Sequence, residues 1–91
     1  MTRVKVSSFF TMKDILGDGN VSLGPGKSTV RGLLQELSRR HGEKFNRQIF
    51  DPETGDVKFY RIVVNGRQVT DMDAPINDGD DIQLFPAMAG G

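Results

Sequence analysis

Hydrophobic and polar residues alternate near the start of the chain. Val4 and Val6 alternate with Arg3, Lys5 and Ser7, which is the two-residue period of a half-buried strand. We therefore expect a strand over residues 3–10. Turn-forming residues at 17–20 and a short apolar run at 21–23 predict the return strand of a hairpin. Three apolar residues in the connection are expected to cap the core: Met12, Ile15 and Leu16.

The hydrophobic period lengthens from two residues to that of a helix after Gly26. Four apolar residues then fall on a single helical face: Val30, Leu33, Leu34 and Leu37. This stripe predicts a helix over residues 29–41, with Ser28 or Thr29 as its N-cap and Gly42 as its C-cap. We interpret His41 as structural, because positive charge in the last turn of a helix suits the helix dipole.

The second half of the chain is typical of strands separated by turns. Irregular spacing leaves residues 43–58 without a predicted element, apart from a turn over 51–56. Residues 59–65 are rich in β-branched and aromatic side chains, which favours a central strand, and Asn65-Gly66 is a type I′ hairpin signal. Two further strands are expected, over residues 68–70 and 81–85.

The order strand-strand-helix-strand-strand-strand predicts an α+β domain. One main helix would pack on one face of a mixed sheet of four to five strands, which fits the β-grasp, or ubiquitin-like, fold. We expect a single domain over residues 1–86, with Pro86 ending the last strand, and a flexible tail over 87–91. The predicted core combines residues from the strands and the helix: Val4, Val6, Leu33, Leu34, Leu37, Ile62 or Val63, Ile82 and Leu84.

Composition excludes several classes of function. The 91 residues include no cysteine and one histidine, which excludes disulfides, thiolate zinc sites, iron–sulfur clusters and sites built from several histidines, so we expect no metal site. Lys plus Arg is 12 and Asp plus Glu is 12, so net charge gives no reason to expect nucleic acid or an anionic membrane as a partner. The first residues show no signal-peptide pattern, and we expect a cytoplasmic binding, carrier or regulatory module.

Three polar patterns are candidate sites. Gly24 to Thr29 precedes a helix, but its spacing does not match a phosphate-binding P-loop, and we interpret it as a turn and a helix cap. The acids of 51–56 do not match the spacing of a calcium loop. Residues 71–91 hold five acids and no Lys or Arg, which is either a solvated face or a docking surface for a basic partner.

The end of the chain is the strongest candidate for chemistry. By strand alternation Phe85 points away from the core side of the last strand, and we expect it to anchor an interface. A tail of small residues with Gly90 and Gly91 at its end could enter a narrow slot and present the carboxylate of Gly91 to another protein. The partner-binding residues expected from this pattern are Phe85, Pro86, Ala87, Met88, Ala89 and Gly90.

These residues, taken in order, resemble the ThiS/MoaD sulfur-carrier family. Val4-Lys5-Val6, Phe9 and the Met12 to Gly17 stretch resemble its first strand and the turn that follows. Asn65-Gly66 and, above all, residues 78–91 resemble its C-terminal third, where a strand, a proline and a Gly-Gly end arrive in the same order. The stretch 43–58 lies outside the resemblance.

The resemblance implies a mechanism and a set of partners. A ubiquitin-activating-type enzyme would use ATP to adenylate the Gly91 carboxylate, a sulfur donor would convert it to a thiocarboxylate, and an acceptor enzyme would take the sulfur. The chain would be a carrier or co-substrate and not itself an enzyme, with no cofactor of its own. The first expectation is molybdopterin synthesis, with this chain as the small subunit of molybdopterin synthase and the large subunit as acceptor.

Three alternatives remain open at this point. The sulfur could go to cysteine or thiamin synthesis. The chain could be a ubiquitin-like modifier that forms isopeptide bonds to lysine. It could also be a passive β-grasp interaction domain, such as an RNA-binding regulatory module, in which removal of Gly90 and Gly91 would change nothing.

Overall fold

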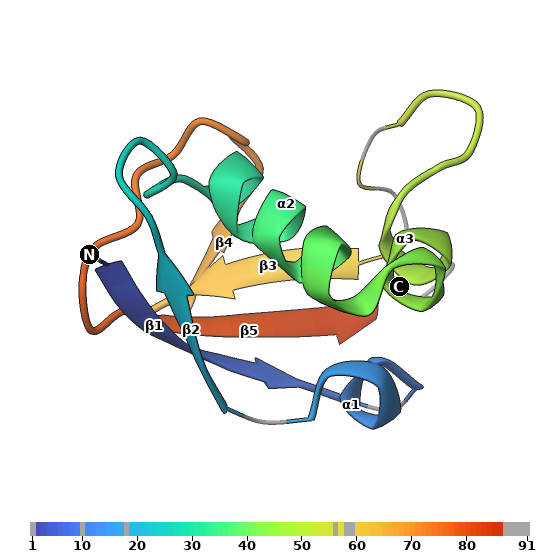
Figure 1. Cartoon of the computed structure of the whole chain (residues 1–91), viewed down its shortest axis with the longest axis horizontal. Coiled ribbons are helices and arrows are strands. Elements are labelled where there is room, and N and C mark those ends of the chain that lie inside the picture. The colour runs from blue at the N-terminus through green and yellow to red at the C-terminus, as the bar shows by residue number, and fades with distance from the viewer. Residues whose placement is uncertain (1, 10, 18, 56, 58–59, 87–91) are drawn as a thin grey trace.

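The fold is a five-stranded sheet with one long helix across one face, as seen in a computed structural model (Figure 1). The structure describes residues 2–9, 11–17, 19–55, 57 and 60–86. The strands are β1 (Thr2–Ser8), β2 (Gly19–Leu23), β3 (Tyr60–Val64), β4 (Arg67–Val69) and β5 (Asp81–Pro86). The helices are α1 (Thr11–Leu16), α2 (Val30–His41) and α3 (Glu43–Ile49).

The sheet is mixed, with the order β2-β1-β5-β3-β4. The first and last strands pair in parallel at its centre, and the other neighbours are antiparallel. This arrangement confirms the predicted β-grasp fold, including the hairpin between β1 and β2. β1 is shorter than expected, because it ends at Ser8 rather than at residue 10.

Helix α2 confirms the helical pattern almost residue for residue. Its N-cap is Thr29, whose side-chain oxygen accepts a hydrogen bond from the backbone N–H of Gly32 at 3.1 Å. The apolar stripe faces the sheet, and Leu34 is only 2% exposed, so the predicted rotation of the helix is correct. Gly42 is the C-cap, and its φ of 64° needs glycine, but its ψ of −142° differs from that of the left-handed C-cap conformation.

The core lies between α2 and the sheet and contains every residue predicted for it. Ile62 rather than Val63 is the core residue of β3. The predicted cap is confirmed, since Met12 is in the core and Ile15 and Leu16 pack against it, but three core residues outside the long elements were not predicted: Phe45, Ile49 and Ile76; with Met12 they make four. The two short helices α1 and α3 supply three of these four, and they close the end of the layer at which β5 ends (Figure 1).

Both predicted turns in the second half are present. Asn65 and Gly66 have φ values of 52° and 84°, the pair of positive angles that a type I′ turn requires. In residues 51–55 the Asp51 carboxylate accepts a hydrogen bond from the Glu53 N–H at 2.9 Å, and the Gly55 N–H donates to the Asp51 carbonyl. In its described residues, the stretch 43–58 therefore contains α3 followed by this turn; Asp56 and Lys58 lie outside the described residues.

Candidate functional site

The point where the chain leaves the sheet is set by β5, the central strand. β5 pairs with β1 on one side and with β3 on the other, so its position is fixed by two ladders of hydrogen bonds. It continues to Pro86, one residue further than expected, where Pro86 lies opposite Tyr60. The predicted site residues Ala87, Met88, Ala89, Gly90 and Gly91 lie outside the described residues, so the described part of the site is this exit point and the sheet face beside it.

Phe85 lies on the sheet face opposite α2. Leu84, the residue before it, is fully buried in the core. Phe85 itself is half-buried, and so is Pro86 at the end of the strand. The alternation of a strand therefore turns Phe85 outward, as the sequence predicted. Phe85 is therefore partly exposed next to the last residue of β5.

The ring of Phe85 stacks on Phe9. The two ring centroids are 4.6 Å apart and the ring planes are within 9° of parallel. Ser8 of β1 lies opposite Leu84 of β5, and the two strands are parallel. The residues that follow them, Phe9 and Phe85, are therefore side by side. Sequence reasoning did not assign Phe9 to the site, because only the parallel pairing of β1 with β5 makes it a neighbour of Phe85.

Beneath the exit point, buried groups join β3 to α1. Tyr60 begins β3 and is mostly buried, and burial raises the pKa of its hydroxyl, while a hydrogen bond with the Met12 backbone acts in the opposite direction. Met12 itself is fully buried. This contact ties the first residue of β3, which lies opposite Pro86, to α1.

The acids that precede the expected site in sequence lie at the other end of β5. Residues 71–80 precede the strand, whereas Phe85 and Pro86 end it (Figure 1). Four of the acids also have structural partners: the carboxylates of Asp71, Asp78 and Asp80 accept backbone hydrogen bonds, and Asp73 pairs with Arg31 at 3.2 Å. These four acids therefore have local structural roles at the end of the sheet away from Phe85, while the fifth, Asp81, begins β5.

The remaining polar patterns also have local structural roles. Residues 24–27 form a turn in which the Lys27 N–H donates to the Gly24 carbonyl at 3.2 Å. Within the described ranges there is no group of three or more His, Asp or Glu side chains able to hold a metal ion. None of the described helices is long and apolar enough to cross a membrane.

Comparison with known proteins identifies the family. The model of the ThiS family matches residues 9–91, which is most of the chain and includes both Phe9 and the Gly-Gly end. The chain belongs to the ThiS family. The resemblance to the ThiS/MoaD sulfur carriers is therefore confirmed, and the fold is the ubiquitin-like β-grasp of that group.

Three solved structures show the range of ThiS-family neighbours. A Pyrococcus furiosus protein designated molybdopterin converting factor, subunit 1, is 33% identical; the match covers 97% of this chain and 100% of that one, with a TM-score of 0.76. The BexX/CysO complex of Amycolatopsis orientalis contains a chain that is 27% identical, covering 97% and 99% with a TM-score of 0.66. Small archaeal modifier protein 1 of H. volcanii is 20% identical, covering 97% and 100%, and its TM-score of 0.82 shows a shared fold. The curated proteins gave no match.

Proposed function

We propose that this ThiS-family chain is a sulfur carrier whose working group is the carboxylate of Gly91. The observation that supports the proposal is the family match, which includes the Gly-Gly end. That end follows a central strand, β5, whose last residue is Pro86. Because β5 is hydrogen-bonded to β1 on one side and β3 on the other, the position from which the tail starts is fixed. Small residues after that origin allow the tail to enter a narrow channel.

The proposed chemistry has two steps. A partner enzyme adenylates the carboxylate with ATP and releases pyrophosphate, because a carboxylate is a poor electrophile and the acyl-adenylate has a good leaving group. Hydrosulfide then attacks the acyl carbon, AMP leaves, and the product is a thiocarboxylate. The nucleotide site and the catalytic groups belong to the partner, so the carrier is a co-substrate and not an enzyme.

Phe85 and Phe9 are proposed as the docking anchor for these partners. Half-buried aromatic rings at the base of a tail supply apolar contact area at a small cost in side-chain entropy. The stack with Phe9 holds the Phe85 ring in one orientation before any partner arrives. A partner that covers this ring pair would receive the tail at a defined place and angle.

Molybdopterin synthesis is the proposed destination of the sulfur, with cysteine synthesis as the alternative. The chain is 33% identical to the protein designated molybdopterin converting factor, subunit 1, and 27% identical to the chain from the CysO complex. In the first case the chain would serve as the small subunit of molybdopterin synthase, and the large subunit would accept the carrier. Sulfur transfer to a purified acceptor enzyme of either pathway distinguishes the two.

Deletion of Gly91 tests the proposal. The shortened chain still ends in a carboxylate on Gly90, but this group falls up to ~3.5 Å short of the ATP phosphate. Adenylation needs near-contact alignment, so ATP–pyrophosphate exchange with the activating enzyme should be nearly abolished. Addition of one Ala after Gly91 should be similarly damaging, and neither change touches the core, so the melting temperature should stay constant. Exchange at the wild-type rate in the deletion variant would contradict both the carrier and the modifier readings.

A separate comparison of three variants tests the docking anchor. Phe85→Ala and Phe9→Ala should each weaken binding to the activating enzyme about tenfold or more, as loss of an interface aromatic does. Phe50→Ala is the matched control, since Phe50 is also half-buried in an aromatic pair, with Phe45, at a centroid distance of 6.1 Å. Isothermal titration should show normal binding for Phe50→Ala. Equal loss of binding in all three variants would assign the effect to folding rather than to docking.

A further inference from the structure

The strand β2 forms one edge of the sheet and carries no protection against pairing with another strand. Edge strands are usually protected by charged side chains, by proline or by being very short. β2 has the sequence Gly-Asn-Val-Ser-Leu, with no charge and no proline over five residues. The opposite edge, β4, has three residues and begins with Arg67. The two edges are therefore not equivalent, and β2 is the one open to strand addition.

The hydrogen bonds of β1 show which backbone groups of β2 face outward. The Lys5 N–H donates to the Asp80 carbonyl at 3.0 Å, so the backbone groups of Lys5 face β5. Because neighbouring residues in a strand point to opposite sides, Val4 and Val6 face β2 instead. Their partners on β2 are Val21 and Gly19.

It follows that Asn20 and Ser22, which lie between these paired residues, turn their N–H and C=O groups to the outside of the sheet. No hydrogen bond within the described part of the chain is recorded to these four groups. They offer two donors and two acceptors in the spacing that an added antiparallel or parallel strand requires. The backbone of β2 is thus a ready template for one more strand.

A hollow of about 180 Å³ lies between this edge and α2. Its apolar lining includes Val6, Leu16, Val21 and Leu37, and its polar lining includes the Arg40 guanidinium and the His41 ring. No acidic side chain lines this hollow among the described residues. Three of the four apolar residues are buried in the core and Leu16 is half-buried, so a side chain that an added strand directs toward α2 would meet Leu16 and the edge of the core, with Arg40 at the rim.

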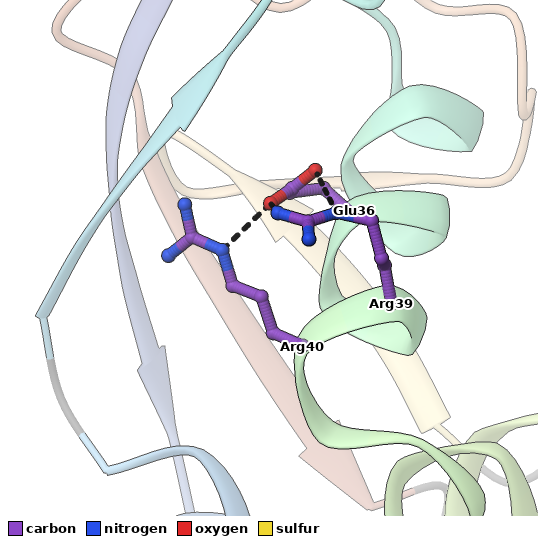
Figure 2. A network of polar contacts seen from close by, with 3 residues as sticks. All are labelled: Glu36, Arg39 and Arg40. Atoms are coloured by element: carbon purple, nitrogen blue, oxygen red, sulfur yellow. Dashed lines mark hydrogen bonds and ion pairs between the residues drawn. The ribbon is translucent and has the colours of Figure 1, made fainter.

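The rim is positive because two guanidinium groups share one carboxylate. Glu36 pairs with Arg39 at 2.6 Å and with Arg40 at 2.7 Å, and Figure 2 shows both arginines turned toward it. The hydrogen bonds from Arg39 and then Arg40 lower the pKa of Glu36 to about 2, so this carboxylate stays charged at neutral pH. Because Glu36 balances only one of the two arginines, Glu36, Arg39 and Arg40 together keep one positive charge. Arg40 lines the hollow, whereas Arg39 does not.

We propose that β2 accepts an extended segment of a partner protein as a sixth strand. The segment would hydrogen-bond to the backbone of Asn20 and Ser22, place apolar side chains in the hollow and set an acidic side chain beside Arg40. The occupant is a partner rather than a second copy, because pairing of two β2 edges would bring two unbalanced positive rims together. This surface is separate from the exit point at Pro86, so a carrier could be held by β2 while its tail is in use.

A peptide titration tests the proposal. The probe is the blocked heptapeptide Thr-Val-Thr-Ile-Thr-Glu-Thr, whose alternation puts Val, Ile and Glu on one face. In ¹H–¹⁵N spectra of the whole chain we expect saturable shifts of the Asn20 and Ser22 amides. The same peptide with Lys in place of Glu should bind at least threefold more weakly.

Two matched pairs of variants make the test specific. Ser22→Pro removes an outward N–H without removing a bond to β1 and should weaken binding about five- to tenfold, whereas Ser22→Ala should not. Arg40→Gln should weaken binding about two- to fivefold, whereas Arg39→Gln, which loses the same kind of ion pair away from the hollow, should not. If Ser22→Pro lowers the melting temperature, Asn20→Pro replaces it for the same reason.

Three results would overturn the proposal. The first is unchanged peptide affinity in a folded Ser22→Pro variant. The second is equal affinity for the Glu and Lys peptides. The third is concentration-dependent dimerisation of the free chain that Ser22→Pro abolishes, because that would assign the β2 edge to a second copy of this chain.

Discussion

Gly32 stands where a side chain cannot fit, and replacing it by alanine should destabilise the protein. Gly32 lies in the first turn of α2, against the backbone of the preceding turn. A Cβ built there would be 2.8 Å from the Lys27 carbonyl carbon and 2.9 Å from its Cα, and nearer still to the carbonyl oxygen. Contacts between carbon atoms are favourable at about 3.5–4.0 Å, so the Lys27 backbone would have to move by at least about half an ångström.

Two effects of opposite sign decide the magnitude. Alanine has the better helix propensity, which favours the Gly32→Ala variant by about 1 kcal/mol. Forcing a methyl group against well-packed atoms costs about 1–3 kcal/mol, and a backbone obstacle lies at the upper end of that range because it cannot rotate away. We expect a net loss of about 1–2 kcal/mol in the free energy of unfolding. For a chain of this size that corresponds to a fall of roughly 5–15 °C in melting temperature.

Thermal unfolding followed by circular dichroism measures the effect. Gly24→Ala is the matched control, since the same change there meets no atom within 4 Å and the φ of Gly24 is not in the left-handed region. That control should be neutral or up to about 1 kcal/mol more stable. A Gly32→Ala variant as stable as the Gly24→Ala variant would refute the close approach of α2 to Lys27.

Three further changes probe the core and its surroundings. Leu34→Ala should lower the free energy of unfolding by on the order of 2–5 kcal/mol in urea titration, because the side chain is 2% exposed in the core; a loss below about 1 kcal/mol would contradict this burial. Ser8→Ala should be neutral or stabilising by up to about 1 kcal/mol, since the buried Ser8 hydroxyl has no hydrogen-bond partner in the described structure; a clear loss of stability would reveal a bond to it. The folded state lowers the pKa of Glu36 from 4.5 to about 2, so its contribution to stability is present in full above pH 4.5 and is lost as pH falls toward 2. Urea midpoints at pH 5 and pH 2.5 should therefore differ more in the wild type than in Glu36→Gln, and an equal difference would contradict the pairing.

The long elements could be predicted from sequence because their patterns repeat. Helix α2 presents more than two turns of apolar stripe, and Thr29 and Asn65-Gly66 are local signals that act through their own backbone. The short helices α1 and α3 could not be assigned in the same way, because six or seven residues hold less than two full helical turns. Phe45 and Ile49 do show the four-residue spacing of a helix, but a single repeat does not distinguish a helix from a loop.

The candidate site was only partly visible in the sequence, because its neighbours come from the topology. Alternation within β5 was enough to turn Phe85 outward. The stack with Phe9 depends on the parallel pairing of the first and last strands, which no local pattern encodes. The acids of 71–80 could be either a solvated face or a docking surface in sequence, and the structure adds that Asp78 accepts a hydrogen bond from the Arg3 N–H of β1 and Asp80 one from the Asn77 N–H of its own turn.

The mass of the intact chain tests the central claim most directly. The purified chain would be incubated with its ubiquitin-activating-type enzyme, ATP and sulfide, with a second sample lacking ATP. Replacement of the terminal hydroxyl by a thiol adds about 16 Da. We predict this increase only in the sample with ATP, located by fragmentation at Gly91, and absent from the Gly91 deletion variant. An unchanged mass, in a reaction where the same enzyme converts another ThiS-family carrier to its thiocarboxylate, would contradict the proposal that this chain carries sulfur.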